Sequence, residues 1–334
     1  MKSTKITLVL LFTMILISGT HAQKNQFINS IAFGSCNKHD LPQPLWKPIL
    51  ADKPDIFVWL GDNVYGDTHN MDLLRAKYEA QDTVAGYLEL KSRTKIIGIW
   101  DDHDYGINDG GKHYAQKEES MQIMLDFLAE PQDSERRRQQ GVYTAYTFGV
   151  GDNSVKLFLL DARYMRDTLE RENGVYLPNK EGSILGDQQW DWLATELKQS
   201  SASVNIIASG IQFIPTEHPY EKWENFPKER QKLFDLISNS KIKNPVLISG
   251  DRHIAEISVL KNKQFPTGLY EITSSGMTHT WKEYKQEYNP YRIGNLIASL
   301  HYGMVDFDWD NGEMTFTIKG EEGQTYLEQT LPIQ

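Results

Sequence analysis

Cysteine is almost missing from this chain, in which Cys36 is the only one among 334 residues. A disulfide bond within the chain is therefore excluded. The single thiol follows a short apolar run, in the stretch FGSCNKHD, and polar residues come directly after it. A free cysteine in such a place can be a small buried apolar residue, a nucleophilic thiolate or a metal ligand. All three interpretations stay open from the cysteine count alone.

Long apolar runs are also missing, apart from one near the N-terminus. The run Ile6–Ile17 has 12 residues, too few to cross a bilayer. Two lysines precede it and the sequence THA follows it, so residues 1–22 are predicted to be a cleaved secretory signal. We therefore expect a periplasmic or secreted protein without a transmembrane segment. Exported proteins normally pair their cysteines, which makes a lone thiol unusual.

Positive charge is scarce in this chain. Lysine and arginine number 35 against 45 aspartate and glutamate residues, which gives a formal net charge of −10. An acidic chain of this kind is a poor partner for the phosphate backbone of nucleic acids, so we expect no nucleic-acid-binding surface. A small anionic substrate is compatible with the charge if something local attracts it. The run of arginines at 136–138 is predicted to be a solvated surface.

Seven apolar segments share one pattern: each is rich in β-forming residues and stops at a polar or glycine-containing cluster. Near-continuous apolar runs are typical of strands that are buried on both faces. Ligands of layered α/β proteins bind at the carboxyl ends of such strands, so the seven loops are predicted to build one shared site. The segments and the residues that follow them are SIAF-GSCN, DIFVWL-GDNVYGD, KIIGIW-DDHDYGIND, VKLFLL-DARYMRD, VNIIA-SGIQF, PVLIS-GDRH and YEIT-SSGMTHTW.

Helical spacing and a hairpin signal complete the pattern. Apolar residues three and four positions apart predict helices over 121–128 and 190–197. Near the C-terminus, apolar residues alternate with polar ones on both sides of Asn311-Gly312. This alternation predicts a β-hairpin with a two-residue type I′ turn at that dipeptide.

Metal ions are indicated by the side chains that follow the predicted strands. Many of these are carboxylates, and gathering them would be strongly repulsive without positive charge among them. Asp251 and His253 are two positions apart, so both point to one face of an extended segment. Asp62 and Tyr65 flank a turn that lets both reach one centre. The full set is Cys36, Asn37, Asp62, Asn63, Tyr65, Asp101, Asp102, His103, Asp104, Asn108, Asp251, His253 and His279.

The types of donor narrow the choice of metal. Thiolate, phenolate, imidazole and carboxylate suit a hard or borderline transition metal, whereas carboxylate and amide oxygens suit Ca²⁺ or Mg²⁺. Tyr65 is the most informative donor because a phenol ionises only near pH 10 unaided. Binding it as phenolate favours a strongly Lewis-acidic ion such as Fe³⁺.

Four of these motifs together resemble a known family. GSCN, LGDNVYGD, WDDHDYGIND and SGDRH, in this order, are similar to the motifs of the alkaline phosphatase D family of metallophosphoesterases. The resemblance implies a four-layer α/β/β/α sandwich with mixed sheets, formed by residues 23–334 as one catalytic domain. It also implies that Fe³⁺ and Ca²⁺ ions activate water to cleave small phosphate esters, either monoesters or diesters.

The resemblance also assigns roles to single residues. It implies that Cys36, Asp62 and Tyr65 bind iron, with His253 as a fourth ligand, and that Asp62 bridges to calcium. The expected ligands on the calcium side are Asn108 and Asp251. From its place in the sequence, His103 is expected either to act as an acid beside the metals or to orient the three aspartates that flank it. Some family members carry an arginine two residues beyond the last histidine, where this chain has Ala255. We therefore predict Arg163 as the phosphate clamp, or equally as a partner of Asp161, with Arg166 and Arg252 as further candidates.

Two other functions are compatible with parts of the pattern. The first is a hydrolase that uses Cys36 as nucleophile and His103 or His253 as base. It accounts for one thiol but not for Tyr65, Asn108 and the many carboxylates. The second is a protein that binds metal or phosphate on the same fold without catalysis, and turnover assays on simple esters would separate it from an enzyme.

Overall fold

The computed structural model describes residues 26–282 and 287–334 of the chain. The predicted signal sequence, residues 1–22, lies outside these described residues, so its cleavage stays a prediction. Within the described residues, none of the helices combines the length and hydrophobicity that a membrane crossing requires.

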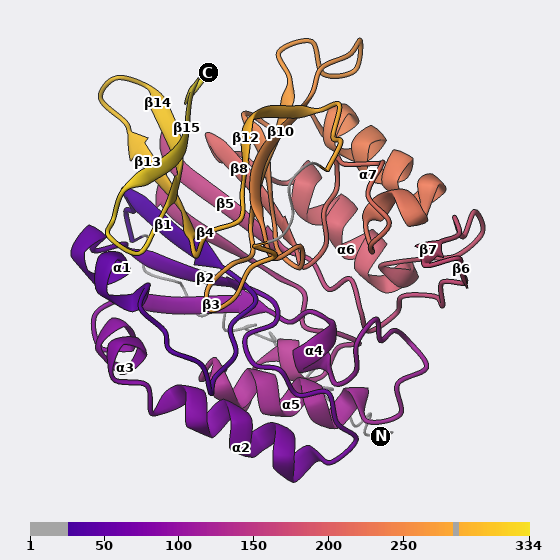
Figure 1. The fold of residues 1–334 in the computed structure, drawn as a ribbon. Coiled ribbons are helices and arrows are strands. Elements are labelled where there is room, and N and C mark those ends of the chain that lie inside the picture. The colour runs from indigo at the N-terminus through magenta and orange to yellow at the C-terminus, as the bar shows by residue number, and fades with distance from the viewer. Residues whose placement is uncertain (1–25, 283–286) are drawn as a thin grey trace, which may run out of the picture.

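Two β-sheets form the centre of the molecule (Figure 1). Sheet A has six strands, in the order β15 (Thr325–Pro332), β14 (Glu313–Lys319), β13 (Tyr302–Asp308), β1 (Ser30–Gly34), β2 (Ile56–Leu60) and β3 (Lys95–Ile99). Sheet B has seven, in the order β12 (Arg292–Ile297), β10 (Ala255–Leu260), β11 (Leu269–Ser274), β9 (Pro245–Ser249), β8 (Val204–Ser209), β5 (Asn153–Leu159) and β4 (Thr144–Val150). A small hairpin, β6 (Arg171–Glu172) and β7 (Val175–Tyr176), stands apart at the right edge of Figure 1.

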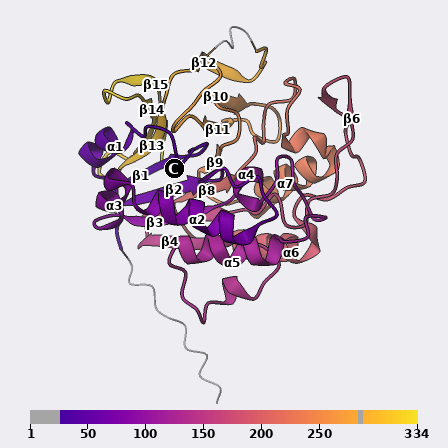
Figure 2. The same cartoon turned by 60° about the horizontal axis from the view of Figure 1, so that its bottom comes forward.

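Helices cover the outer face of each sheet. On sheet A these are α1 (Trp46–Asp52), α2 (Met71–Asp82), α3 (Ala85–Lys91) and α5 (Lys117–Phe127), and Figure 2 shows α2 and α5 in front. On sheet B they are α6 (Gly186–Lys198) and α7 (Pro227–Ser240). Three short helical segments, α4 (Asp102–Tyr105), η1 (Glu135–Arg137) and η2 (Trp223–Asn225), lie in loops.

The alternation of side chains in sheet B explains the four layers. Val246 and Ile248 of β9 join the core cluster shared with sheet A, whereas Leu247 between them joins the cluster formed with α6 and α7. Successive side chains of a strand point to opposite faces, so both faces of the sheet are buried. In sheet A, Trp59 packs edge-on against Trp46 of α1, with ring centroids 5.6 Å apart. The predicted α/β/β/α arrangement is confirmed.

The seven predicted strands are all present, as β1, β2, β3, β5, β8, β9 and β11. They supply the parallel pairs of both sheets: β1, β2 and β3 are parallel neighbours in sheet A, and β5, β8, β9 and β11 in sheet B. The two predicted helices correspond to α5 and α6.

The predicted hairpin is present, but its predicted turn is wrong. β13 and β14 pair antiparallel up to Asp308 and Glu313, so residues 309–312 form a four-residue connection. A type I′ turn needs positive φ at both central residues, and in this connection only Gly312 has one, at 65°. The Asp308 carboxylate accepts bonds from the backbone and side chain of Asn311 at 3.0 and 2.7 Å, which stabilises the longer loop.

The arginine run at 136–138 also differs from expectation. Arg136 and Arg137 are buried, and only Arg138 is exposed. Arg136 donates to the carbonyls of Gly98 and Val142, both at 2.7 Å. A solvated surface is therefore wrong for two of the three residues, because their guanidinium groups satisfy buried backbone oxygens.

Candidate metal centre and active site

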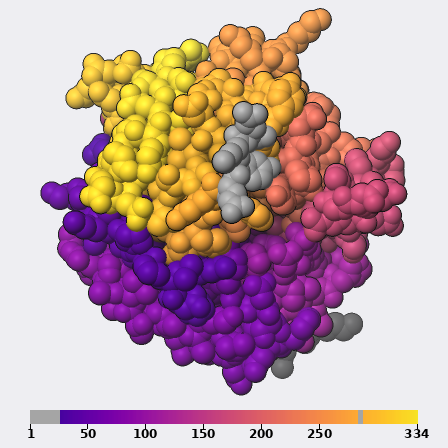
Figure 3. All heavy atoms as spheres, in the orientation of Figure 1, coloured from indigo at the N-terminus to yellow at the C-terminus, as the bar shows by residue number. Residues whose placement is uncertain are grey.

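The carboxyl ends of strands from both sheets meet at one place. Cys36 follows β1, Asp62 follows β2, and Asp251 follows β9 of the other sheet. Gly250 makes this approach possible, because a Cβ atom there would lie 2.6 Å from Ser35 Oγ and 2.8 Å from the Leu60 carbonyl oxygen. Segments far apart in the sequence thus share one face, with the N-terminal third in indigo and purple below the orange and yellow C-terminal segments (Figure 3).

Left-handed backbone geometry is concentrated at these strand ends. Cys36, Asp62, Asp251 and His253 have φ angles of 60°, 50°, 67° and 55°. Residues other than glycine rarely adopt such angles, and the strain costs on the order of 1–3 kcal/mol each. Strain of this kind persists where surrounding structure fixes a side chain for function. These four belong to a set of eleven described non-glycine residues with positive φ, and they share the strand ends at which the two sheets meet.

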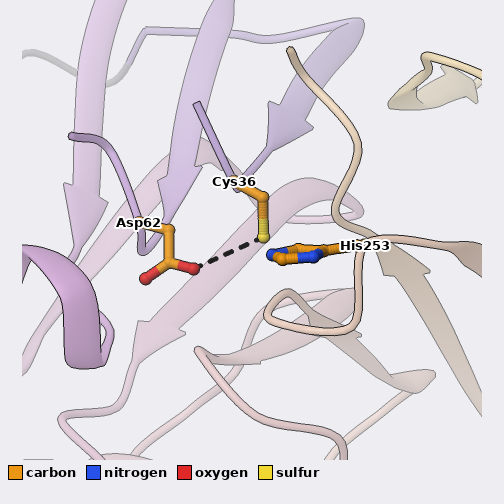
Figure 4. Close-up of side chains that lie close together, drawn as sticks. All are labelled: Cys36, Asp62 and His253. Atoms are coloured by element: carbon orange, nitrogen blue, oxygen red, sulfur yellow. Dashed lines mark hydrogen bonds between the residues drawn. The ribbon is translucent and has the colours of Figure 1, made fainter. Parts of the chain in front are cut away.

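Three of the predicted iron ligands, Cys36, Asp62 and His253, point toward one another (Figure 4). Cys36 Sγ lies 3.5 Å from Asp62 Oδ2, and donor atoms of all three lie within 4.8 Å of one another. Ligands of one transition-metal ion lie about 2.0 to 2.3 Å from it, so these separations are close to what a shared ion requires. The hydroxyl of Tyr65, the remaining predicted iron ligand, is 3.4 Å from Asp62 Oδ2 and 2.9 Å from His253 Nε2.

A second group of carboxylates adjoins the first. Asp251 lies with Asp101 and Asp102, and donor atoms of the three are within 4.8 Å of one another. Asp62 belongs both to the first group and to a group with Asp102 and His103, an arrangement that fits the predicted bridging role. Asn108 is exposed and donates to Asp109 Oδ2 at 2.7 Å, at the rim of the same cavity as Asp102 and Asp251.

Sequence reasoning gave no role to Asp102 or to His279. Asp102 is buried and belongs to both neighbouring carboxylate groups. His279 lies in the loop after β11, and its Nε2 is 3.0 Å from the Tyr65 hydroxyl. Both residues stood among the side chains that follow predicted strands. The position of Asp102 and His279 after predicted strands was thus the only sequence signal for a role in the site.

His103 lies over the ring of Tyr65 and lines the cavity, with the two ring centroids 4.1 Å apart. Its Nδ1 donates to Asp67 Oδ1 at 2.7 Å. Burial lowers the pKa of His103, but the carboxylates of Asp62, Asp67 and Asp102 outweigh burial and raise it to about 10. The imidazole is therefore held in place by one nitrogen and can carry a proton beside the carboxylates of Asp62 and Asp102.

Arg163 is fully buried and does not line the cavity. Its Nε and Nη2 donate to the two carboxylate oxygens of Asp101 at 2.6 and 2.9 Å, and its Nη1 forms an ion pair with Glu221. The backbone N–H of Arg163 donates to Asp161 Oδ1 at 2.8 Å. The guanidinium group thus fixes the carboxylate of Asp101, which is itself a member of the second group.

Another buried carboxylate supports the loop that presents Asp62. Asp104 accepts bonds from the backbone N–H groups of Asp62 and Asn63, both at 3.1 Å, and from the Tyr78 hydroxyl at 2.9 Å. The Asn37 backbone N–H donates to the Asp62 carbonyl at 2.8 Å. These bonds hold the ends of β1, β2 and β3 in a fixed relation.

The acidic donors are poorly stabilised as anions by the protein alone. Burial raises the pKa of the Cys36 thiol well above its usual range, and the carboxylates of Asp62 and Asp251 raise it further. Burial likewise raises the pKa values of Tyr65, Asp62 and Asp251, and neighbouring acidic groups add to the effect. His253 is held neutral, because burial and nearby His279 lower its pKa to about 3. A metal ion is bound by neutral imidazole and by deprotonated acids, and it supplies the positive charge that these buried acids lack. The arrangement therefore fits metal ions.

An open cavity of ≈ 190 Å³ lies directly over this cluster. The residues that line it include Asp102, His103, Asp251, Arg252, Tyr220 and Trp281. Arg252 is buried, donates to Glu287, and has no hydrogen-bond partner for its Nε among the described residues. The cavity thus joins candidate metal ligands to a buried cation.

The sequence profile of the PhoD-like phosphatases matches residues 31–324. This chain belongs to the PhoD-like phosphatase family. The resemblance predicted from the four motifs is confirmed. Among curated relatives, alkaline phosphatase D of Bacillus subtilis (strain 168) is 23% identical over 281 residues, which cover 69% of this chain. The matched region is 47% of that relative, so the chain spans about half of its length.

Solved structures with the same fold agree with this family. The structure of PhoD superposes with a TM-score of 0.74 at 17% identity and covers 93% of this chain and 70% of that one. A dimetal phosphatase from Danio rerio superposes with a TM-score of 0.53 at 12% identity and covers 92% of this chain and 100% of that one. At these identities the likeness establishes the shared fold.

Proposed function

We propose that this chain is a metal-dependent phosphoesterase that hydrolyses small phosphate esters. The observation that carries the proposal is the convergence of Cys36, Asp62, Tyr65 and His253 at one point beside a carboxylate group under an open cavity. Membership of the PhoD-like phosphatases supports it.

The donor set divides into two kinds of site. Cys36, Asp62, Tyr65 and His253 would hold Fe³⁺, for which a thiolate and a phenolate are suitable ligands. Asp251 and Asn108, with Asp102 added from the structure, would hold Ca²⁺, which prefers carboxylate and amide oxygens. Such ions, when bound, neutralise phosphate oxygens and activate water for in-line attack.

The protein's own groups position the ester and move a proton. Arg252 replaces Arg163 as our candidate for the phosphate clamp, because it lines the cavity and its Nε has no hydrogen-bond partner in the part of the chain that the structure describes. Arg163 becomes a positioning residue, since its guanidinium is committed to Asp101. His103 lines the cavity and is oriented by Asp67 through Nδ1, so its Nε2 would give a proton to the leaving oxygen.

The alternative thiol hydrolase receives little support from the geometry. Cys36 is fully buried, and burial raises its pKa. Catalytic thiolates need the reverse, a lowered pKa and an accessible sulfur. A metal- or phosphate-binding protein without catalysis leaves unexplained why a histidine oriented by a carboxylate lines the cavity.

Export of the protein is part of the proposal. It rests on the N-terminal sequence, with its two lysines, its short apolar run and the sequence THA. We infer a periplasmic or secreted enzyme that acts on phosphate esters outside the cytoplasm.

Elemental analysis beside turnover assays tests the function. Protein purified without chelator should contain about one iron and additional calcium per chain, and should hydrolyse a simple phosphate monoester or diester. Cys36→Ser should lose iron and activity together, because the thiolate is a ligand. Full activity in metal-free protein would refute the proposal. Activity lost from Cys36→Ser with its iron retained would favour the thiol hydrolase.

A further inference from the structure

Two aromatic side chains, here called the aromatic wall, line the cavity beside His253 and Arg252. The aromatic wall consists of Tyr220, from the loop after β8, and Trp281, from the loop after β11. Trp281 is 43% exposed, although large aromatic side chains in this protein are mostly buried. An exposed tryptophan that lines a polar cavity offers apolar surface that a bound ligand can cover. Such exposed apolar surface is typical of a binding site.

The aromatic wall contacts both His253, a candidate metal ligand, and Arg252, the candidate phosphate clamp. The ring of Trp281 stacks on that of His253, with centroids 5.7 Å apart and planes 24° apart. Its backbone N–H donates to the His253 carbonyl at 3.2 Å. On the other side, Trp281 and Tyr220 have ring centroids 5.9 Å apart, and the guanidinium of Arg252 lies 4.3 Å from the centroid of Tyr220. The two rings therefore span the distance between a candidate metal ligand and the candidate phosphate clamp.

We propose that Trp281 and Tyr220 form a subsite for a planar aromatic group on the leaving-group side of the phosphate ester. The proposal rests on the phosphoesterase function, because the subsite is defined by where the phosphate would bind. A phosphate held between the metal cluster and Arg252 places its ester substituent beside these rings. Aromatic pairs prefer offset-stacked or edge-to-face contacts and favour a planar ring over a saturated ring of equal size.

Two kinds of ester carry such a ring. An aryl ester has it directly on the ester oxygen, and a nucleotide has it one sugar further away. Trp281 adjoins His253 with no residue between the two rings, which favours the directly attached ring.

Two pairs of ligands test the subsite: the first compares a planar ring with a saturated ring, and the second compares the presence and absence of a base. Binding of phenylphosphonate and cyclohexylphosphonate to the metal-loaded protein is measured by calorimetry, because phosphonates bind without being hydrolysed. A second pair, adenosine 5′-monophosphate and ribose 5-phosphate, is measured as competitive inhibition. We expect phenylphosphonate to bind about threefold to tenfold more tightly than its saturated partner, the range of one aromatic contact.

Three variants locate the effect. Trp281→Leu and Tyr220→Leu should abolish the preference for the planar ring while the metal content stays unchanged. Tyr288→Leu is the control, since Tyr288 is 71% exposed and does not line the cavity, and it should keep the preference. If the nucleotide pair responds to the variants as well, the subsite reaches a base beyond a sugar.

Several results would overturn the subsite. These are equal binding within both ligand pairs, a preference that survives both leucine variants, or no binding of either phosphonate. Loss of metal together with both phosphonates in the leucine variants would show that the rings only support the metal site. If the preference behaves as expected but the wild-type protein hydrolyses no ester, the phosphoesterase function fails while the subsite stands.

Discussion

Arg163 and Arg252 are both buried near the proposed site. The guanidinium of Arg163 contacts buried carboxylates, whereas Arg252 lines the cavity itself. Arg163 has its guanidinium paired with Asp101 and Glu221 and does not reach the cavity. Arg252 pairs with buried Glu287 and lines the cavity, and its Nε has no hydrogen-bond partner among residues 26–282 and 287–334. From these contacts we propose that Arg163 positions the Asp101 carboxylate and that Arg252 binds the phosphate group.

Lysine substitution of each arginine should give different phenotypes. Lysine keeps the charge but loses the fork that binds two oxygens at once. Arg252→Lys should raise KM for phosphate esters about tenfold, the value of a charge-assisted hydrogen bond, with metal content unchanged. Arg163→Lys should instead lower thermal stability and metal content, because Asp101 loses its paired contacts. Steady-state kinetics, thermal melts and elemental analysis measure these effects. An unchanged KM in Arg252→Lys would remove Arg252 from the clamp.

The phenol of Tyr65 offers a spectroscopic test of the iron site. A phenolate bound to Fe³⁺ should give a charge-transfer band, so concentrated protein should be coloured, whereas unliganded aromatic residues absorb only in the ultraviolet. Tyr65→Phe removes one oxygen and leaves the ring in place. The band should shift or vanish, and iron content and phosphatase activity should fall.

A second tyrosine supplies the control for that test. Tyr78 is buried and its hydroxyl donates to Asp104 at 2.9 Å, outside the metal group. Tyr78→Phe should keep the colour, because Cys36, Asp62 and Tyr65 remain. An unchanged spectrum and rate in Tyr65→Phe would contradict the assignment of this residue to iron.

The run Asp101-Asp102-His103-Asp104 shows the limit of sequence reasoning for single side chains. Nothing in the run distinguishes its three carboxylates. In the structure, Asp101 pairs with Arg163 but stays beside Asp102 and Asp251, whereas Asp104 accepts backbone N–H groups and lies in none of the candidate metal groups found among the described residues. The partners come from the loop after β2, from α2 and from the loop after β5, and pairings at such separations leave no local pattern.

Strands were predictable because their signal is local. Each predicted strand depends only on the apolar character of a few consecutive residues. All seven predicted strands are present in the parallel parts of the two sheets. The polar clusters after them could be expected to meet, because carboxyl ends of parallel strands share an edge. The type of turn at Asn311-Gly312 was missed although its acceptor, the Asp308 carboxylate, is only three residues away in the sequence. The burial of Arg136 was missed because its acceptor, the Gly98 carbonyl, is 38 residues away in the sequence.

Two Gly-Asp pairs allow a matched test of the strand ends. Gly250-Asp251 follows β9 in the site, whereas Gly151-Asp152 forms an exposed turn between β4 and β5. Asp251→Ala should reduce kcat/KM by orders of magnitude and lower the calcium content, since it removes a ligand. Asp152→Ala should leave the rate unchanged and alter stability by less than about 0.5 kcal/mol. Near-wild-type kinetics in Asp251→Ala would remove that residue from the site.

The order of strands within the sheets could not be predicted from the sequence. β1 lies between β2, its near neighbour in the chain, and β13, which lies some 270 residues later and pairs antiparallel with it. In sheet B, β9 lies between β8 and β11, while β10 lies beyond β11. Such pairings are set by how helices cover the faces and by which edges remain free, and apolar runs alone do not specify them.

His301 connects the two sheets at the level of the whole molecule and gives a prediction about pH. Its backbone N–H donates to the Gly276 carbonyl at 3.1 Å, and its Nε2 accepts from the Ser275 N–H at 3.0 Å. Nδ1 donates to the Ser299 carbonyl at 2.7 Å. Gly276 follows a strand of sheet B, and His301 directly precedes β13 of sheet A. A neutral imidazole thus satisfies groups on both sides.

Burial lowers the pKa of His301 to about 4, against about 6.5 in an unfolded chain. Between these values the unfolded state binds more protons than the folded state, so the free energy of unfolding falls as the pH falls from 6.5 to 4. The full loss from this group is about 3 kcal/mol. His301→Asn cannot take up the proton, so its stability should depend less steeply on pH in this window, although it is lower at neutral pH.

Urea denaturation at a series of pH values measures the effect as a difference between proteins. The metal ligands also titrate, but they contribute equally to wild type and variant, so the difference isolates His301. His113→Asn is the control, because His113 is exposed, and this variant should keep the wild-type pH dependence. If His301→Asn and the wild type lose stability in parallel from pH 6.5 to 4, protonation of His301 is not what weakens the contact between the sheets.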